Sequence, residues 1–332
     1  MPNWVTPGYE VLELSTQRLI AAALDRGISV EILDDKTQWI RLRKNGKTEI
    51  IRQGNETSAD SYITGLILGD KSIQKILLSE VGVRVPTGGK YSSVTAAMAD
   101  FPKYAQGQWV IKPTTANYGL GITMLPENVS ASQFESAVQE AFAHDDTILI
   151  ETFLPGIECR FLVIGGKCRA VLHRVPANVI GDGTHTIAQL VTAKNDDPRR
   201  GQGYKTPLEK IKLTETEKLV LAEQGFDFDS VPDGGVQVWL RNNSNISTGG
   251  DSLDYTDVVH PDYLAIAEKA TAAVNAQICG VDMMMGDHTA SPTDSNYGII
   301  ELNYNPVLYF HDFPYVGENR NVAPHVLDVL GF

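Results

Sequence analysis

Residues 298–306 read GIIELNYNP, an apolar run that ends in a carboxylate, Glu301, and an amide, Asn303. The apolar run predicts a buried β-strand whose last residues leave the core. A second apolar run, CGVDMMM at residues 279–285, carries another carboxylate, Asp282. If the two predicted strands are antiparallel neighbours, the side chains of Asp282, Glu301 and Asn303 converge on one point of a sheet.

These three side chains offer hard oxygen ligands, with no His or Cys among them. Mg²⁺ prefers such ligands and usually completes its coordination with water and substrate phosphates. The pattern therefore predicts a magnesium site that holds a nucleotide. Either acid taken alone is read more simply as a surface group at a strand end, and only the joint pattern favours a metal.

Composition limits the classes of protein to consider. The chain has 332 residues, 42% of them hydrophobic, and a formal net charge of −13. This length suggests two or three subdomains. The negative charge argues against a nucleic-acid or anionic-membrane partner, since such partners are bound by clustered Lys and Arg. No apolar run approaches the roughly 20 residues that span a bilayer, and the first residues do not resemble a targeting signal, so we expect a soluble, cytoplasmic protein.

The three cysteines, Cys159, Cys168 and Cys279, have no CxxC spacing. Neither a disulfide framework nor a zinc site is indicated, and buried thiols are the simpler interpretation.

Helical and strand patterns alternate along the chain, which favours a mixed α/β fold. Residues 15–27 have helical apolar spacing, and residues 28–33 alternate as a half-buried strand. Several dipeptides and caps predict where elements turn, begin or end. These are the hairpin turns Asn45-Gly46 and Gly165-Gly166, a helix from Asp70 to Gly82, and a capping box of Thr214 with Glu217. We expect three units, over residues 1–107, 108–155 and 156–332.

Further residues suited to a nucleotide precede the acidic strands. Lys112 ends the apolar strand WVIKP, which would hold its ammonium group rigidly near phosphate oxygens. The turn that follows contains Asn117, Gly119 and Gly121, whose backbone N–H groups are little obstructed by side chains. Such glycine turns often only connect strands, so this turn alone is weak evidence.

The segment ILIETFLPGIE, residues 148–158, places Glu151 at a strand end and Glu158 seven residues later. Between them, Phe153 and Leu154 lie in an extended hinge whose backbone groups can pair with an adenine edge, while a carboxylate reaches the ribose hydroxyls. The alternative is an exposed linker between domains.

Arg160 and Arg174 lie on the two strands of a predicted hairpin and could point at one site. The planar guanidinium suits carboxylate or phosphoryl oxygens, although plain surface charge is about equally simple for either residue. Arg241 and Asn245 flank the loop NISTGG and are further candidates for phosphate or substrate contact, as is Asn305 for substrate. The basic segment at residues 194–205 reads as a solvated, mobile lid.

A set of residues, taken in chain order, resembles the ATP-grasp pattern of carboxylate-amine ligases such as D-alanine:D-alanine ligase and glutathione synthetase, over nearly the whole chain. The set is Lys71 in GDKSIQK, Lys112, Glu151, Glu158, Asp282, Glu301 and Asn303. Five segments closely resemble the ATP-grasp half of the bacterial bifunctional family that joins glutamate-cysteine ligase to glutathione synthetase. They are RVPANVIGDGTHTIAQLV, NDDPRRGQGY, PLEKI, NSNISTGGDSLDYTD and PYVGENR. Cyanophycin synthetase carries related GDGxHTI and DPRRG motifs, so these motifs do not name the substrate.

The resemblance implies an ATP-grasp fold in which residues 108–155 form a lid, and it implies roles for the candidate residues. Lys71 and Lys112, with the Asn117, Gly119 and Gly121 turn, would contact ATP phosphates. Glu151, Phe153 and Leu154 would bind adenine, and Glu158 the ribose. Asp282, Glu301 and Asn303 would carry two Mg²⁺ ions bridged by Glu301, with Mn²⁺ as the alternative metal. Arg160, Arg174 and Arg241 would act on the reacting groups, and Asn245 and Asn305 on the substrate.

The implied reaction joins a carboxylate to an amine through an acyl phosphate, most simply γ-glutamylcysteine to glycine with ATP. We expect Glu301→Ala or Asp282→Ala to abolish turnover while leaving the fold intact. The segment NPVLYFHDFPYVGENR departs from the bifunctional family, since it carries Asp312 where Cys is expected. Another amino-acid or dipeptide ligase, or a nucleotide-binding module without turnover, therefore stays open. So do the exact donor and acceptor, a homodimer, the role of residues 181–205, and whether the chain is free-standing or part of a bifunctional enzyme.

Overall fold

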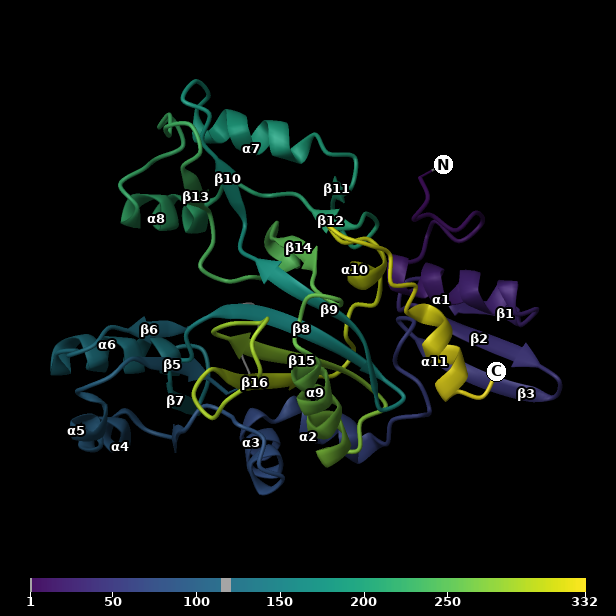
Figure 1. Cartoon of the computed structure of the whole chain (residues 1–332), viewed down its shortest axis with the longest axis horizontal. Helices are drawn as coiled ribbons and strands as arrows, with labels where there is room; N and C mark the ends of the chain where they lie inside the picture. Colours follow the sequence, from purple (N-terminus) through teal and green to yellow (C-terminus); the bar gives the residue numbers. More distant parts are fainter. Residues whose placement is uncertain (1, 115–120) are drawn as a thin grey trace.

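The computed structural model describes residues 2–114 and 121–332. Its core is a five-stranded antiparallel sheet, flanked by a four-stranded sheet at one end and a three-stranded sheet at the other (Figure 1). A small α/β insertion lies beyond the edge strand of the central sheet (Figure 1). This is a mixed α/β architecture, as the sequence pattern predicted.

The central sheet has the strand order β14-β9-β8-β15-β16. Its strands are β8 (Ile157–Ile164), β9 (Lys167–Val175), β14 (Asp251–Asp254), β15 (Ile278–Met285) and β16 (Tyr297–Asn303). The β8–β9 hairpin turns at Gly165 and Gly166, both at positive φ, which confirms that prediction.

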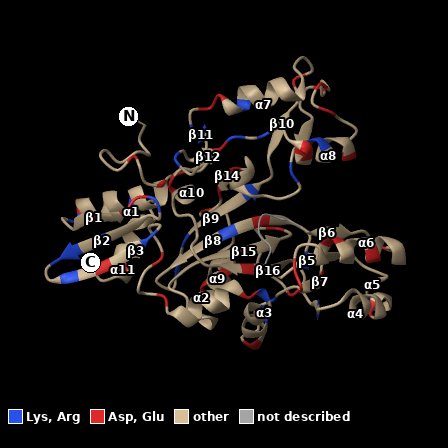
Figure 2. Ribbon diagram, turned by 180° about the vertical axis from the view of Figure 1, so that it is seen from behind, with Lys and Arg blue, Asp and Glu red and all other residues tan. Residues whose placement is uncertain are grey.

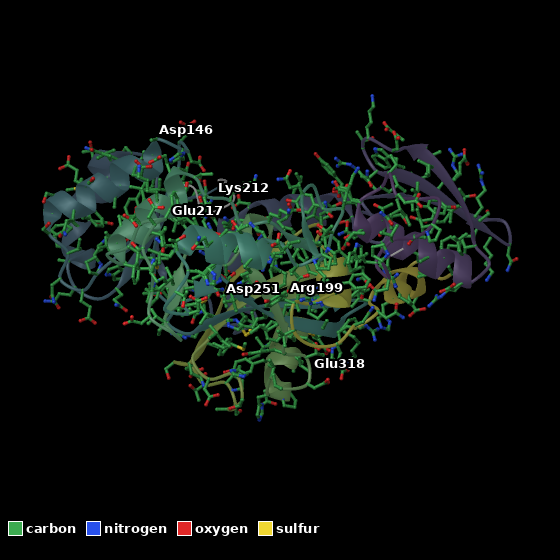
Figure 3. All side chains as sticks on the ribbon, turned by 90° about the horizontal axis from the view of Figure 1, so that it is seen from above. Asp146, Arg199, Lys212, Glu217, Asp251 and Glu318 are labelled. Atoms are coloured by element: carbon green, nitrogen blue, oxygen red, sulfur yellow. The ribbon has the colours of Figure 1, made fainter. Side chains whose placement is uncertain are left out.

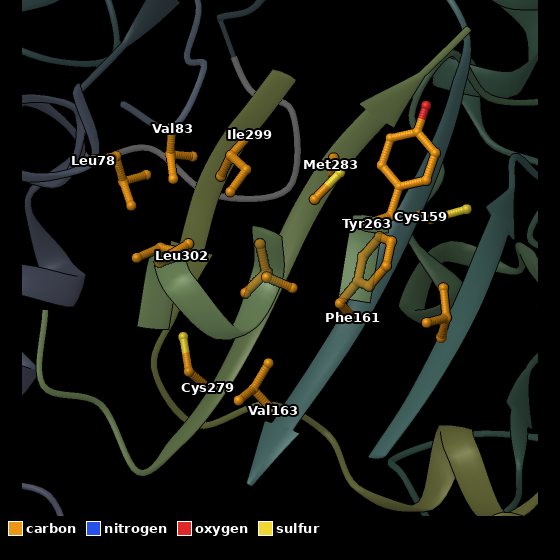
Figure 4. Close-up of a cluster of buried hydrophobic side chains, with 14 of the residues drawn as sticks. Leu78, Val83, Cys159, Phe161, Val163, Tyr263, Cys279, Met283, Ile299 and Leu302 are labelled. Atoms are coloured by element: carbon orange, nitrogen blue, oxygen red, sulfur yellow. The ribbon is translucent and has the colours of Figure 1, made fainter. Parts of the chain in front are cut away.

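One face of the central sheet is apolar and is covered by helices. The covering helices are α2 (Tyr62–Gly69), α3 (Lys71–Glu80) and α9 (Pro261–Ala273). Figure 4 shows Phe161, Val163, Met283 and Ile299 from three strands packed with Tyr263 of α9. Because side chains alternate between the two faces of a strand, this packing directs the intervening polar residues to the opposite face.

The four-stranded sheet, ordered β4-β7-β5-β6, forms a smaller unit. It contains β4 (Gly88–Tyr91), α4 (Val94–Ala99), α5 (Phe101–Tyr104), β5 (Trp109–Pro113), β6 (Thr123–Leu125), α6 (Ala131–Phe142) and β7 (Ile148–Thr152). Phe134 of α6 stacks on Tyr104 with the ring centroids 5.7 Å apart. Since β4, α4 and α5 share this core, the unit extends from Gly88, whereas the sequence placed its start at residue 108.

The N-terminal residues do not form one unit ending at residue 107. Helix α1 (Leu14–Asp25) and the sheet of β1 (Ser29–Asp34), β2 (Trp39–Lys44) and β3 (Lys47–Arg52) share a core with the C-terminal helix α11 (Ala323–Val329). The β2–β3 turn has φ of 50° at Asn45 and 81° at Gly46, as predicted for a type I′ turn. Helix α3 begins after Asp70, whose carboxylate accepts from the first free amides of the helix, and that cap is also confirmed.

The insertion contains its own small core. Its elements are β10 (Asn178–Ile180), α7 (Ile187–Asn195), β11 (Arg200–Gly201), β12 (Leu208–Glu209), α8 (Glu215–Glu223), β13 (Gln237–Trp239) and the 3-10 turn η1 (Ile246–Thr248). The capping box of Thr214 and Glu217 begins α8, as predicted. The short helix α10 (Tyr309–Asp312) follows β16.

The basic segment at residues 194–205, which includes β11, was expected to be a solvated, mobile lid, and the structure corrects this. Arg200 is buried and forms an ion pair with Asp251, which also accepts from Lys194 Nζ at 2.7 Å. Figure 3 places Asp251 and Arg199 near each other, and the Arg199 guanidinium lies 5.0 Å from the ring centroid of Tyr315. These contacts anchor the segment to β14 instead of leaving it free in solvent.

Candidate active site

The polar face of the central sheet carries a row of charged residues on three neighbouring strands. Arg160 on β8 lies directly opposite Asp282 on β15, which lies directly opposite Glu301 on β16. Residues opposite one another on antiparallel strands project from the same face. Asn303, two residues after Glu301, donates from Nδ2 to Asp282 Oδ2 at 3.1 Å. The two acidic strands are thus antiparallel neighbours, which is the condition under which the sequence expected these side chains to converge.

The Asp282 carboxylate is buried, with 2% of the residue exposed, and is surrounded by donors. Arg160 donates to both of its oxygens, from Nε and from Nη2, at 2.6 Å each. Arg174 Nη2 donates to Oδ2 at 3.0 Å. Burial would raise the pKa of Asp282, but the charges of Arg160 and Arg174 outweigh burial and hold the pKa well below its usual range. Asp282 is therefore ionised and holds both guanidinium groups in place.

Glu158 joins the same cluster from the start of β8. Its carboxylate pairs with Arg174 and accepts from the hydroxyl of Ser244. Arg174 therefore bridges two carboxylates, and the predicted hairpin does bring Arg160 and Arg174 together. In Figure 2, basic and acidic segments meet on the central sheet.

Three lysines form a second cluster where α3 meets β5 and β7. Lys112 Nζ lies 2.9 Å from Glu151 Oε2, and Lys75 contacts the same carboxylate. Lys71 Nζ lies 3.2 Å from Glu301 Oε2, so Lys71 links the lysine cluster to the acidic row on the central sheet. Three lysine side chains here share two carboxylates.

Because both are buried and negative charge is short in this cluster, the pKa values of Lys75 and Lys112 lie below the usual lysine value. Burial, with the charges of Lys112 and Lys71, lowers the pKa of Lys75 to about 6. Burial and the charge of Lys71 lower the pKa of Lys112 to about 8. An added anion would be stabilised by both groups, because it would supply the missing counter-charge. Sequence reasoning missed Lys75, although its spacing of four residues from Lys71 on one helix placed both on the same face.

Two cavities adjoin these clusters. A cavity of about 260 Å³ on the polar face of the central sheet is lined by Arg160, Arg174, Glu301 and Asn303, and also by Asn245 and His311. A wider one of about 690 Å³ lies between α3 and the β4–β7 edge and is lined by Lys75 and Glu151. The lysine cluster thus borders one cavity and the acidic row the other.

The hinge and the glycine turn are only partly described. The Phe153 amide donates to Gln108 O at 2.9 Å, and Leu154 is buried. Asn117 and Gly119 lie outside the described residues. Gly121 has φ of 68°, and a Cβ there would lie 2.7 Å from the His144 ring, so a glycine is required at this position.

The three remaining candidate residues, Arg241, Asn245 and Asn305, do not line one common cavity. Arg241 does not line either cavity, and its Nε donates to buried Glu217 at 2.5 Å. Asn245 lines the cavity with the two arginines. Asn305 lines a third cavity beside it.

The segment NPVLYFHDFPYVGENR, which departs from the bifunctional family, contains a residue with a structural role. The Asp312 carboxylate accepts from the Val322 amide at 2.9 Å and pairs with Arg18 at 3.4 Å, away from the cavity lining. His311, to which the sequence assigned no role, lines the cavity, where burial and the charge of Arg160 lower its pKa to about 3. His311 is therefore neutral near physiological pH.

The residues present fit a divalent hard cation. Glu301 keeps a quarter of its side chain exposed and is paired with a single lysine, so its carboxylate can accept a metal. Asp282 and the side-chain oxygen of Asn303 lie beside it on the same face. In residues 2–114 and 121–332, no group of three or more His, Cys, Asp or Glu side chains is placed to hold a metal, so a metal here would have two carboxylates and one amide oxygen as its protein ligands.

Comparisons with known proteins agree with this geometry. A model of the ATP-grasp-like domain matches residues 10–63. The glutathione biosynthesis bifunctional protein GshAB of Clostridium perfringens is 50% identical over 323 residues, which are 97% of this chain and 42% of that protein. The protein of the same name from Desulfotalea psychrophila is 46% identical over 330 residues, which are 99% of this chain and 42% of that protein.

Among solved structures, the crystal structure of a bifunctional glutathione synthetase from Pasteurella multocida superposes with a TM-score of 0.78. It is 42% identical in sequence, and the match covers 99% of this chain and 45% of that one.

The chain therefore has the ATP-grasp fold and is similar to these proteins over nearly its whole length. The relatives at 41–50% identity are named glutathione biosynthesis bifunctional proteins. The chain spans less than half the length of the curated relatives it matches. Over the described residues, no helix combines the length and apolar character that crossing a bilayer requires.

Proposed function

We propose that the chain is an ATP-dependent carboxylate-amine ligase that forms a peptide-like amide through an acyl phosphate. The best-supported reaction joins γ-glutamylcysteine to glycine and yields glutathione, ADP and phosphate. The observation that carries the proposal is the junction at Lys71 and Glu301, where a buried lysine cluster meets an arginine-held acidic row. The names of the relatives support the choice of substrates.

The lysine cluster would bind the phosphates of ATP. Lys71, Lys75 and Lys112 share the carboxylates of Glu151 and Glu301, and a polyphosphate would draw a proton onto Lys75, whose pKa of about 6 leaves it largely neutral before ATP binds. The three side chains are already in position, so little reorganisation is needed when phosphoryl transfer begins.

The nucleoside would lie along the hinge after β7. The family resemblance assigns adenine to Glu151 and to the backbone at Phe153 and Leu154, and the ribose to Glu158. The burial of Glu151 and the position of Glu158 at the start of β8 are compatible with these roles. ATP release would then return Glu158 to its contacts with Arg174 and Ser244.

ATP-grasp ligases use ATP with a divalent metal. Asp282, Glu301 and Asn303 would hold Mg²⁺, in two copies by resemblance, with Mn²⁺ as the alternative metal. The metal would neutralise charge on the phosphate oxygens.

Arg160 and Arg174 would orient the donor carboxylate and stabilise the negative charge of the acyl phosphate. Their guanidinium groups line the cavity and are fixed by Asp282, so little freedom is lost when an anion binds. The acceptor amine would then attack the activated carbonyl carbon and expel phosphate.

A protein nucleophile is not part of this proposal. Burial raises the pKa of Cys279 to about 12, and burial also raises the pKa of Cys159. Neither thiol lines the cavity that holds the two arginines. Both are inert core groups under physiological conditions.

The test is steady-state release of ADP and phosphate from Mg-ATP, with mass spectrometry of the products. Release should require both a carboxylate donor and an amine, and the pair γ-glutamylcysteine plus glycine should give glutathione. The exposed substitution Glu135→Gln on α6 serves as a control that should keep full activity. Release indifferent to the amine would overturn the ligase proposal, and a different productive pair from a panel of amino acids and dipeptides would change only the substrate. Nucleotide binding without any ligation product would identify a binding module instead.

A further inference from the structure

A third cavity, of about 260 Å³, adjoins the cavity that holds Arg160 and Arg174. It lies where the start of α1, the loop after β3 and the segment after β16 meet. The two cavities share Tyr204 and Val307 as lining residues. Tyr204 belongs to the basic segment whose role the sequence left open.

The lining of this third cavity contains hydrogen-bond acceptors and no Lys, Arg or His. Asn55 is 3% exposed, and its Nδ2 donates to Pro306 O, which leaves Oδ1 without a partner in the described structure. The hydroxyl of Tyr309, a residue 1% exposed, likewise has no partner there. Buried polar atoms normally have partners, so these two atoms point to a ligand.

Glu13 adds a negative charge to the same cavity. No hydrogen bond or ion pair involves its carboxylate within residues 2–114 and 121–332, and burial raises its pKa. A half-buried carboxylate without a counter-charge is costly unless a cation binds beside it. In contrast, the neighbouring cavity presents two guanidinium groups.

The walls are held rigidly in unusual backbone conformations. Gln53, Tyr204 and Asn305 line the cavity with φ of 53°, 59° and 55°. The Tyr204 amide donates to Glu209 Oε1 at 2.8 Å, and the Asn305 side chain is held by Gln53 and Glu56. Non-glycine residues persist in this region only when their surroundings enforce it, and such positions concentrate at functional sites.

We propose that this cavity binds the ammonium group of the carboxylate donor, through Glu13, Asn55 Oδ1 and the Tyr309 hydroxyl. An ammonium group has three N–H donors and no acceptor, which matches three acceptors and a negative charge. The proposal rests on the ligase function, since the donor carboxylate would lie beyond Tyr204 and Val307, between the arginines. A donor that reaches both cavities is extended, of dipeptide length, rather than a single α-amino acid.

The test compares two probes that differ only in this group, γ-glutamylcysteine and glutarylcysteine, which lacks the α-amino group. Their dissociation constants are measured by calorimetry with the full chain, Mg²⁺ and a non-hydrolysable ATP analogue. The unmodified chain should bind γ-glutamylcysteine about tenfold to a hundredfold more tightly, as expected for a charge-assisted hydrogen bond. Glu13→Gln and, separately, Tyr309→Phe should reduce that preference severalfold while leaving glutarylcysteine binding unchanged.

Glu10→Gln is a matched control at an exposed position three residues away and should keep the full preference. Equal binding of the two probes to the unmodified chain would overturn the proposal, as would equal losses for both probes in Glu13→Gln. Failure of both probes to bind would also overturn it.

If the preference holds but no combination of donor and amine causes ADP release, the ligase function fails and the ammonium site stands. If ADP release requires the amine but the preference is missing, the ammonium site alone fails.

Discussion

Glu301→Gln and Asp282→Asn each remove one carboxylate from the same face of the central sheet. Glu301→Gln should reduce turnover with little loss of stability, whereas Asp282→Asn should reduce both. The Asp282 carboxylate is buried and is the shared partner of Arg160 and Arg174. Removing one partner of a buried ion pair costs about 3–5 kcal/mol, because the remaining charge is left uncompensated. For a cooperative chain of 332 residues, with an unfolding entropy of about 2.1 cal/mol/K per residue, that loss lowers Tm by roughly 4–7 °C.

Glu301 is different, because a quarter of its side chain is exposed and, among the residues that the structure describes, its only ion-pair partner is Lys71. A partly exposed pair contributes about 0–1 kcal/mol, so Glu301→Gln should lower Tm by less than roughly 2 °C. Turnover should nevertheless fall about 100-fold to 1,000-fold, since several kcal/mol of charge stabilisation in phosphoryl transfer would be lost. The structure therefore revises the expectation that both substitutions leave the fold intact.

The assays are a thermal melt and coupled ADP release, performed on both variants and on the Glu135→Gln control. Glu301→Gln should keep its Tm and lose activity, whereas Asp282→Asn should lose both. Near-normal turnover in Glu301→Gln would refute the metal assignment. An unchanged Tm in Asp282→Asn would refute the claim that its carboxylate holds the arginines in place.

Three further predictions concern other parts of the molecule. At pH 7.5, ATP binding should take up about 0.5–1 proton, because phosphates raise the pKa values of Lys75 and Lys112 from about 6 and about 8. The affinity for ATP should therefore weaken as pH rises from 7 to 9. Calorimetry in buffers of different ionisation enthalpy measures the proton uptake, and an absence of uptake would count against the lysine assignment. Asp251→Asn leaves Arg200 buried without its counter-charge, so it should destabilise the chain by about 3 kcal/mol in denaturant titration. The KM for ATP should stay the same. A changed KM with normal stability would contradict this prediction. Gly46→Ala places a side chain at φ of 81° and should cost about 1 kcal/mol in the same titration, with unchanged kcat; no loss would contradict the turn assignment.

Sequence predicted the local structure best where few residues decide it. Asn45-Gly46 and the Asp70 cap depend on backbone preferences of neighbouring residues, and both appear as expected. The convergence of Asp282 with Glu301 was expected only if their two strands paired, and the observed register depends on a bulge at Ile300 that strand periodicity does not predict.

Features that depend on distant segments were missed. Glu13, Asn55 and Tyr309 come from three separate regions of the chain, and no spacing in the sequence links them. Arg200 looked like surface charge because its partner Asp251 is 51 residues away in the chain. Strand β4, with the sequence GGKY, lacks an apolar pattern, so the start of the small unit could not be predicted.

The central claim is that the donor carboxylate attacks ATP and becomes an acyl phosphate before the amine arrives. The most direct measurement uses γ-glutamylcysteine labelled with ¹⁸O in its cysteinyl carboxylate, together with glycine and Mg-ATP, and mass analysis of the released phosphate. Our account predicts one ¹⁸O atom in each phosphate from a fully labelled donor, because the carboxylate oxygen that attacks phosphorus leaves with it. Product formation with unlabelled phosphate would contradict the account.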